Sequence, residues 1–506
     1  MKKIERNLEQ ASKENYDLII IGGGIYGACL LLTASQVGKK ALLLEKDDFG
    51  AATSFNNLRT VHGGLRYLQS LDVKRIFESV SERRWFFRNF PDLVKPLPCL
   101  MPLYGKGVYK PSIFRFALLL NDLLSFDRNK GVVHKRKLPN GKIVSKTEVK
   151  EIYPQVDDKN LKGGAVWYDG AMPDTQKLLI EIIKWGCSLK GLALNYTEAT
   201  DLMTKDGKVF CVKAVDKIDN KIYEFKSEKV VNASGPWCRI LAAKFDKDYP
   251  KLFKDSFAWN ALFNHPALSS HALAVTPKKP GARTYFIHHW KGLLFAGTVH
   301  SPWKDCSRTP MPDENSIKTF IDELNFSIKN LNLNLSDVLQ IFPGLLPAKE
   351  EGSDKLAVRE VIINHAETGG PKGFFSVSGV KFTTARLVAE KTIKRLFNVD
   401  LGNLSRDGRK PLSEQELGIF KNNWIPTENN GWEDTIKNII NDESVVHLDD
   451  LMIRRTSLGD NPKLALKYSE KYCGLFKWND SDKSKEISRL KKFYNSRRIS
   501  DLDLTN

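Results

Sequence analysis

The segment 17–67 constrains the fold of this chain more than any other stretch. It opens with the apolar run 18–21, which is typical of a buried parallel strand. Three glycines with G-x-G-x-x-G spacing follow, at Gly22, Gly24 and Gly27. The first permits a tight turn out of the strand, the second lets the backbone approach a pyrophosphate, and the third lets the next helix pack on the sheet.

The residues after these glycines complete a dinucleotide-binding pattern. We expect a helix from about 26 to 37, whose free amino-terminal N–H groups and dipole favour phosphates. A second strand, 41–45, ends in Glu45, where a carboxylate accepts the hydroxyls of an adenosine ribose, and an acid there favours a free ribose over a 2′-phosphate. The simpler alternative is a glycine turn between a core strand and a helix, which the combination of strand, helix and acid disfavours.

Length and composition indicate a large protein of a reducing compartment. The 506 residues are 42% hydrophobic, which predicts two or three domains. We find no apolar run of bilayer-spanning length, and the charged first ten residues lack the apolar core of a secretory signal. The seven cysteines are scattered without a C-x-x-C pair, so we predict a cytoplasmic protein with no metal site.

The net charge of +18 has several explanations. A solvated basic surface is the simplest, and an anionic membrane, a phosphorylated substrate or nucleic acid are the others. The apolar run 113–126, flanked by Lys110, Arg115 and Arg128, fits either a core helix or an interfacial helix that dips into a membrane. We recognise no RNA-binding module, so we expect no nucleic-acid partner.

The rest of the chain alternates helical and strand patterns. Helices are predicted at about 71–90, 175–189, 313–330 and 385–396, a strand and a turn at 142–153, an antiparallel β-meander over 193–231, and strands at 272–276, 284–288 and 293–298. A late strand, Gly379 and the two threonines before the last of these helices form a second helix end suited to an anion.

Several motifs together make the chain resemble a known family. They are Ile21-Gly-Gly-Gly-Ile-Tyr-Gly27, Ala52-Thr-Ser54, His62-Gly-Gly-Leu-Arg-Tyr-Leu68, Val231-Asn-Ala-Ser-Gly-Pro-Trp237 and Gly379-Val-Lys-Phe-Thr-Thr-Ala-Arg386. Over about residues 15–397 the chain resembles the FAD-dependent glycerol-3-phosphate dehydrogenases, within the D-amino-acid-oxidase-like flavoproteins. A shorter stretch, 449–459, is similar to the helical C-terminal domain of that family.

The resemblance implies an α/β fold with α+β elements and non-covalently bound FAD. A discontinuous, Rossmann-like FAD-binding domain would take residues 1–75, 155–240 and 355–397, a β-sheet substrate domain 76–154 and 241–354, and a helical C-terminal region 398–506. The implied cofactor residues are Gly22, Gly24, Gly27, Glu45, Thr53, Ser54, His62, Gly63, Gly64, Ala233, Gly235, Gly379, Lys381, Thr383 and Thr384. A covalent link from His62 to the flavin is a less favoured alternative.

The resemblance also implies a substrate site made of Arg66, Tyr67, His271, Arg359 and Lys381. Among them His271, Arg66 and Lys381 would be catalytic, with His271 the favoured proton acceptor because histidine titrates near neutral pH. Two departures weaken the match to the family's phosphate clamp. Leu346 stands where the family has an arginine, and Val299-His300 replaces a Thr-Asp pair.

We therefore expect hydride transfer from a small anionic hydroxy compound to FAD, with glycerol-3-phosphate as the leading candidate. The expected partners are that substrate, a quinone or other electron acceptor, and an anionic membrane surface, with the protein peripheral on the cytoplasmic face; a homodimer stays open. The alternatives are a paralogue that oxidises another hydroxy acid, sugar derivative or amine, an RNA-binding flavoprotein, and a NAD(P)-binding protein without flavin.

Overall fold

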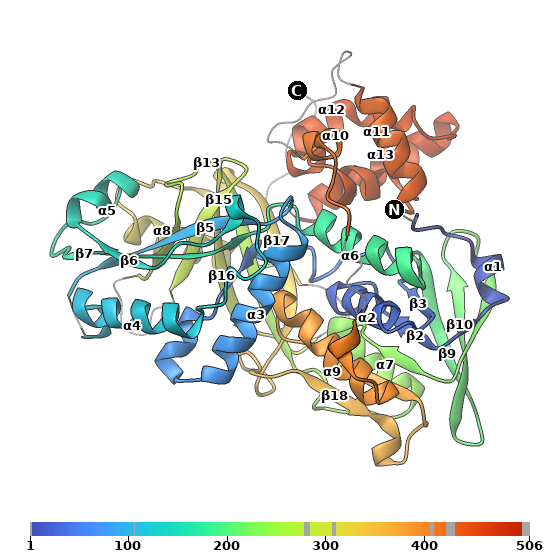
Figure 1. The fold of residues 1–506 in the computed structure, drawn as a ribbon. Coiled ribbons are helices and arrows are strands. Elements are labelled where there is room, and N and C mark those ends of the chain that lie inside the picture. The colour runs from blue at the N-terminus through green and yellow to red at the C-terminus, as the bar shows by residue number, and fades with distance from the viewer. Residues whose placement is uncertain are drawn as a thin grey trace.

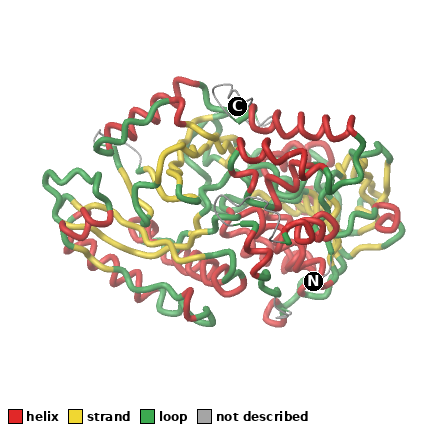
Figure 2. The backbone as a smooth tube through the Cα atoms, turned by 90° about the horizontal axis from the view of Figure 1, so that it is seen from above, coloured by secondary structure: helices red, strands yellow, loops and turns green. Residues whose placement is uncertain are grey.

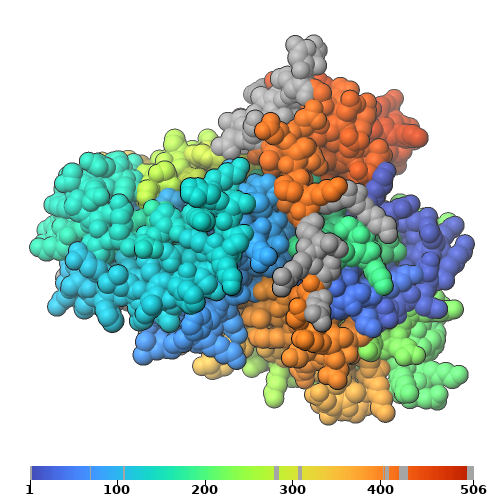
Figure 3. Space-filling view, in the orientation of Figure 1, coloured from blue at the N-terminus to red at the C-terminus, as the bar shows by residue number. Residues whose placement is uncertain are grey.

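The computed structural model describes residues 3–105, 107–277, 284–305, 310–404, 409–420 and 431–497. Within them the strands form three sheets. Two β-containing lobes lie side by side in Figure 1, and the carboxy-terminal helices rise above them as a third lobe in Figures 1 and 3. Seen from above in Figure 2, strands occupy both ends of the molecule.

A six-stranded sheet of order β18-β19-β12-β2-β3-β8 forms the core of one lobe. Its strands are β2 (Leu18–Ile21), β3 (Ala41–Leu44), β8 (Gly191–Leu194), β12 (Val230–Asn232), β19 (Phe374–Ser378) and β18 (Val361–Asn364). All neighbours run parallel except β18 and β19. The runs Leu-Ile-Ile-Ile and Ala-Leu-Leu-Leu are buried along their whole length, as parallel strands covered on both faces require.

Helices cover one face of this sheet and a second sheet covers the other. The helices are α2 (Ile25–Gln36), α6 (Thr175–Leu189) and α9 (Ala385–Phe397), whose apolar side chains share one core with β2 and β3. The opposite face packs on β1 (Asn15–Tyr16), β9 (Thr197–Lys205), β10 (Lys208–Asp216) and β11 (Ile222–Ser227), with α1 (Leu8–Ser12) and α7 (Cys238–Phe245) nearby. This order of layers places the carboxyl ends of β2, β3 and β12 at one edge, where such folds bind ligands.

The other lobe is built on a nine-stranded sheet of order β17-β13-β16-β15-β14-β5-β7-β4, with β6 beside β7. Its strands are β4 (Thr60–Val61), β5 (Lys95–Leu103), β6 (Lys142–Val144), β7 (Gly163–Ala171), β13 (Asp255–Pro266), β14 (Ala272–Val275), β15 (Tyr285–Trp290), β16 (Leu293–Pro302) and β17 (Val338–Pro347). Its helices are α3 (Val73–Asn89), α4 (Pro111–Leu124), α5 (Lys146–Ile152) and α8 (Glu314–Ser327). Apolar side chains of α8 fill one face of this sheet.

The carboxy-terminal region is helical and packs against the rest of the chain. It contains α10 (Glu414–Gly418), α11 (Trp432–Asp442), a π-helix (Asp450–Arg455), α12 (Pro462–Cys473) and α13 (Asp480–Asn495). Its core includes Phe55 from the loop after β3, and Trp290 and Phe342 from β15 and β17 of the nine-stranded sheet. None of the described helices is both long and apolar enough to cross a bilayer.

The predicted elements match the structure well, with three differences. The helix expected at 175–189 is α6, and the β-meander expected over 193–231 is present except that its first and last residues form β8 and β12 in the parallel sheet. The turn expected after 144 is the helix α5, which begins at a capping box of Ser145 and Glu148. Strand β7 lies in the larger sheet although segment 155–240 is predicted to belong to the FAD-binding domain, because its nine residues pair along the whole of β5.

Candidate active site

The glycine loop between β2 and α2 has the shape that a dinucleotide pyrophosphate requires. Gly22 has φ of +110°, and a Cβ on it would lie 2.7 Å from the carbonyl oxygen of Ala233. A Cβ on Gly27 would lie 1.8 Å from the carbonyl oxygen of Gly22, so the helix can approach the strand only without a side chain there. Gly24 begins α2 without a side-chain cap, which leaves the helix end open to a ligand.

Glu45 lies directly after β3, next to this loop. Its carboxylate accepts the N–H of Gly23 at 2.5 Å and that of Asp47 at 2.9 Å, so the ribose-binding residue predicted from sequence also braces the glycine loop. Burial raises the pKa of Glu45 to about 7, although these two hydrogen bonds oppose the shift. The arrangement fits FAD because each carboxylate oxygen keeps a lone pair for a ribose hydroxyl.

The small-residue loop after Glu45 connects the cofactor lobe to strand β17. Ser54 Oγ accepts the N–H of Ile25 at 3.0 Å, and Thr53 Oγ1 donates to the carbonyl oxygen of Leu345 at 3.2 Å. These two contacts fix the positions of the predicted cofactor residues Ser54 and Thr53. Because Thr53 is bonded to Leu345, it lies close to Leu346, the next residue of β17. Leu346 itself is half-buried on β17, opposite Ser256 of β13.

The His62-Gly63-Gly64 stretch is fixed by Asp169, a residue that sequence reasoning did not select. His62 Nδ1 lies 3.0 Å from Asp169 Oδ2, His62 Nε2 lies 3.0 Å from Thr60 Oγ1, and Gly63 N donates to Asp169 Oδ1 at 2.7 Å. Burial raises the pKa of Asp169, but His62 and Arg83 more than offset this and hold it below its usual value. Both ring nitrogens of His62 have partners, so a covalent link to the flavin would first have to break one of these contacts.

Lys381 is held by Tyr26, the second residue of α2. The hydroxyl of Tyr26 donates to the carbonyl oxygen of Lys381 at 2.7 Å and accepts its N–H at 3.1 Å. A Cβ on Gly379 would lie 1.7 Å from the Tyr26 ring, which explains why that position is glycine. Sequence analysis quoted Tyr26 as part of the glycine motif without giving it a role, because nothing in a sequence pairs residues 355 positions apart.

An open groove brings together three of the five predicted substrate residues, Tyr67, Arg359 and Lys381. Its other lining residues are Arg75, Glu78, Ser79, Val358, Glu360, Val380, Thr384 and Leu387. The Lys381 ammonium lies over the Tyr67 ring, 4.4 Å from its centroid, and the Arg75 guanidinium lies 4.7 Å from the same centroid. The groove is therefore lined by three cations, two of them at the Tyr67 ring, and by the carboxylates of Glu78 and Glu360.

The charge state of Lys381 is shifted within this groove. Partial desolvation, reinforced by the neighbouring positive charge of Arg66, lowers the pKa of Lys381 to about 8. Arg66 therefore lies close to the groove, and its side chain is exposed. Arg359 donates from Nη1 to Glu78 Oε2 at 2.8 Å, so part of its charge is already paired.

Like Arg66, His271 is a predicted substrate residue that does not line this groove. It precedes β14 in the larger sheet, where its Nδ1 lies 3.2 Å from Ser270 Oγ. Burial, together with the charges of Lys142 and His289, lowers the pKa of His271 below its usual value.

The remaining predicted cofactor residues surround the glycine loop and the start of α9. Ala233 N donates to the carbonyl oxygen of Ile21 at 2.8 Å, which continues the β2–β12 pairing, and Gly235 turns the chain with φ of +60°. Thr384 caps α9 without a side-chain hydrogen bond to the helix. The 3₁₀ turn Phe382–Thr384 precedes α9, and the N–H groups of Thr384 and Ala385 donate to the carbonyl oxygens of Lys381 and Phe382. The role of this helix end as a second anion acceptor stays a prediction.

Comparison with known proteins agrees with this geometry. The family model described as FAD-dependent oxidoreductase matches residues 17–395. This chain belongs to that family. It is thus an enzyme that uses FAD, and the predicted α/β flavoprotein fold and FAD cofactor are confirmed.

Curated relatives share a more specific name. The aerobic glycerol-3-phosphate dehydrogenase of Bacillus subtilis (strain 168) is 29% identical over 423 residues, which cover 83% of this chain and 72% of the relative. The enzyme of the same name from Staphylococcus aureus (strain USA300) is 29% identical over 393 residues, covering 77% and 68%.

Solved structures show the same fold. A Bacillus halodurans glycerol-3-phosphate dehydrogenase complexed with FAD has a TM-score of 0.70 at 20% identity, covering 97% of this chain and 96% of that one. The L-α-glycerophosphate oxidase of Mycoplasma pneumoniae, solved with FAD, has a TM-score of 0.55 at 16% identity, covering 79% and 98%. The predicted class, an FAD-dependent oxidoreductase that resembles glycerol-3-phosphate dehydrogenase, is confirmed.

Proposed function

We propose that this enzyme oxidises a small anionic hydroxy compound, with glycerol-3-phosphate as the leading candidate, and passes the electrons to a quinone. The observation that carries the proposal is the groove in which Lys381 and Arg359 meet Tyr67 beside Arg66. Several cationic groups at one aromatic face suit an anion. The names of the curated relatives support the choice of glycerol-3-phosphate.

In this proposal the flavin, when bound, would accept a hydride from the carbinol carbon of the substrate. Arg66 and Arg359 hold the anionic group of the substrate. Lys381 in its neutral form takes the proton of the hydroxyl, since a pKa of about 8 leaves part of it neutral near neutral pH. His271 is the alternative acceptor, and its place outside the groove lining favours Lys381.

The small-residue loop 52–54, with the hydroxyls of Thr53 and Ser54, and the amino end of α2 would hold the pyrophosphate and ribityl chain, and Glu45 would hold the adenosine ribose. The amino end of α9 at Thr383 and Thr384 would direct the positive end of the helix dipole toward the developing negative charge of the reduced ring. We also propose that residues 1–75, 172–240 and 355–397 form the FAD-binding domain, with β7 counted in the substrate domain because of its pairing with β5.

The substrate test is anaerobic bleaching of the bound flavin by a panel of glycerol-3-phosphate, other phosphorylated polyols, hydroxy acids and amino acids. Bleaching by glycerol-3-phosphate, lost in an Arg66→Gln variant that still binds FAD, is the expected result. Bleaching by an uncharged compound alone would remove the anion from the proposal, and bleaching by amino acids alone would favour the paralogue alternative.

We further propose that the protein attaches to the cytoplasmic face of an anionic membrane through α4. Exposed apolar side chains on this helix include Phe116, Leu119 and Leu123, with exposed fractions of 68%, 63% and 69%. Lys110 and Arg115 are exposed beside them, whereas Arg128 is turned inward and donates to the carbonyl oxygen of Ser125 at 3.2 Å. An apolar face with basic neighbours is the pattern of a helix that lies in a membrane interface, where a quinone would be accessible.

A further inference from the structure

A dense buried charge network joins the carboxy-terminal region to the loop that follows Glu45. Its centre is Asp48, whose side chain is fully buried. Asp48 accepts two hydrogen bonds from Arg455, at 2.7 and 2.9 Å, and one from Arg454 Nε at 2.5 Å. Asn195 Nδ2 donates to the same carboxylate at 3.0 Å. The two arginines come from a π-helix more than 400 residues further along the chain.

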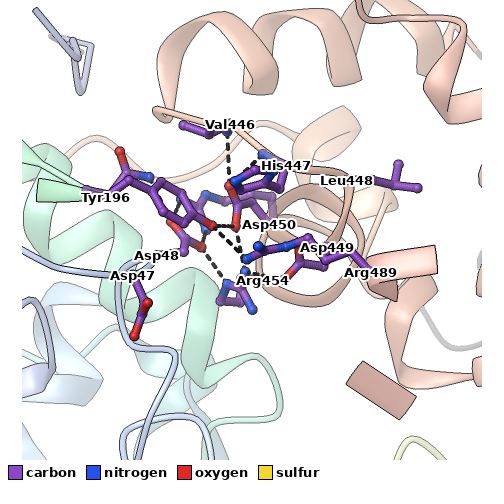
Figure 4. Close-up of polar contacts among 12 residues, drawn as sticks. Asp47, Asp48, Tyr196, Val446, His447, Leu448, Asp449, Asp450, Arg454 and Arg489 are labelled. Carbon is purple, nitrogen blue, oxygen red and sulfur yellow. Dashed lines mark hydrogen bonds and ion pairs between the residues drawn. The ribbon is translucent and has the colours of Figure 1, made fainter. Parts of the chain in front are cut away.

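Arg454 and Arg455 also make hydrogen bonds to residues other than Asp48. Arg454 Nη2 donates to Asp450 at 2.6 Å and to Asp449 at 3.1 Å, while the Tyr196 hydroxyl donates to Asp450 at 2.6 Å; these residues converge in Figure 4. Arg455 Nη2 also donates to the carbonyl oxygen of Glu443 at 3.1 Å. Burial alone would raise the pKa of Asp48, but Arg455 and Arg454 hold it well below its usual value. Asp48 is therefore charged, and its position depends on both arginines.

The short loop between Glu45 and Asp48 couples the position of Asp48 to that of the Glu45 carboxylate. The N–H of Asp47 donates to the Glu45 carboxylate at 2.9 Å, and the carbonyl oxygen of Asp47 accepts the N–H of Tyr196 at 3.0 Å. The carbonyl oxygen of Glu45 accepts the N–H of Thr197 at 2.7 Å. Only Lys46 and Asp47 lie between Glu45 and Asp48, and these pairs leave the segment little freedom, so we expect a shift of Asp48 to displace the Glu45 carboxylate.

We infer that Arg454 and Arg455 are positioning residues for the adenosine end of FAD, so that the carboxy-terminal region completes the cofactor site. The inference rests on the proposed role of Glu45 as the ribose-binding residue. It differs from a purely structural role, in which the network would join two parts of the chain and leave cofactor affinity unchanged. Arg455 acts through Asp48 and the loop, and needs no contact with FAD.

The test uses the full chain, freed of flavin and titrated with FAD or with ADP. Arg455→Lys keeps a positive charge but loses the paired hydrogen bonds to Asp48, and we expect it to weaken binding of both ligands about tenfold. The matched control is Arg489→Lys, because Arg489 joins the same network at Asp449 with a 2.6 Å hydrogen bond. We expect the control to change both affinities less than about twofold. Equal losses in the two variants would overturn the inference.

A double-mutant cycle with Glu45→Gln separates positioning from stability. If Arg455 acts through Glu45, the loss caused by Arg455→Lys becomes small in the Glu45→Gln background. Independent, multiplicative losses would overturn the inference and leave the Glu45 assignment intact. No loss in Glu45→Gln alone would reject the Glu45 assignment and the inference with it.

A measurement on the unmodified protein covers the case in which Arg455→Lys does not fold. Binding of ADP should slow amide hydrogen exchange over residues 446–455, because the ligand, the Glu45 loop and the π-helix form one connected unit. Protection confined to the glycine loop and residues 41–48 would count against the inference.

Discussion

The hydroxyl of Tyr26 makes two hydrogen bonds to the main chain of Lys381, at 2.7 Å to the carbonyl oxygen and at 3.1 Å from the amide nitrogen. One side chain thus links the pyrophosphate-binding helix α2 to the segment before α9. Burial raises the pKa of Tyr26 above its usual value, so the hydroxyl stays protonated and can donate to the carbonyl at any working pH.

Removing that hydroxyl should disturb Lys381 more than the overall fold. Tyr26→Phe leaves the N–H and C=O of Lys381 without this partner, at a cost of about 1–3 kcal/mol, and we expect flavin reduction to slow about tenfold. Rapid-mixing measurements under anaerobic conditions give the rate. Tyr16→Phe is the control, because the buried Tyr16 hydroxyl also donates to a backbone carbonyl, that of Ala11, at 2.9 Å and away from the groove. Equal effects of the two changes would contradict the expected role.

The proton acceptor can be assigned from the pH dependence of flavin reduction. If neutral Lys381 takes the proton, the rate rises with pH through about 8 and then levels off, since the amine loses its proton over that range. Lys381→Met should lower the plateau about 100-fold and remove this titration. A profile that keeps its inflection in Lys381→Met and loses it in His271→Asn would assign the role to His271 instead.

FAD affinity should fall in mild acid because of Glu45. Its pKa of about 7 means that the carboxylate gains a proton as the pH drops through 7. The ribose hydroxyls donate to the ionised form, so the Kd of FAD should rise about threefold to tenfold between pH 8 and pH 6. Titration of the flavin-free protein checks this. Glu45→Gln should bind more weakly at pH 8 and show a flat pH profile, and a slope that survives the substitution would place the titrating group elsewhere.

Sequence reasoning reached the cofactor lobe because its signals are local. Gly22, Gly24 and Gly27 lie within one turn and one helix start, and their spacing alone fixes the geometry. The Asp48–Arg455 pair could not be predicted, because the sequence does not show which distant charges meet in the interior. Asp169 was missed for the same reason, since it faces His62 from a strand that pairs across the other lobe.

Helix α4 shows a different limit. Its hydrophobic period is compatible with burial as well as exposure, and the structure exposes Ile113, Phe116, Leu119 and Leu123 while burying Leu118. Changing Phe116, Leu119 and Leu123 together to serine should reduce binding to anionic vesicles about 1,000-fold or more, since each buried side chain contributes about 1.5–3 kcal/mol. Flotation measures the bound fraction.

The control for this membrane prediction changes exposed apolar residues elsewhere. Phe210→Ser with Ile222→Ser alters the meander sheet, where the two side chains are 41% and 68% exposed. It should float with vesicles as the unmodified protein does. Flotation that is equal in all three proteins, or that does not respond to anionic lipid, would contradict the role of α4.

We expect Leu346 to limit how tightly a phosphate is held. The strand β17 carries it next to Leu345, whose carbonyl oxygen accepts from Thr53, so the residue lies close to the cofactor loop. The family resemblance places an arginine here, and loss of one buried cation from a phosphate clamp costs about 2–5 kcal/mol. We therefore expect Leu346→Arg to lower the glycerol-3-phosphate concentration for half-maximal bleaching about tenfold or more.

A second substitution at the same position, without a change of charge, is the control for that experiment. Leu346→Met conserves volume and adds no charge, so it should leave the half-maximal concentration almost unchanged. With a carboxylate substrate in place of the phosphate, the gain from Leu346→Arg should be smaller, because a phosphate offers more acceptor oxygens and more charge to a bidentate guanidinium. If Leu346→Arg brings no gain for any anion, the pocket has been rebuilt around an apolar wall, and a substrate with an apolar group at that position becomes the better candidate.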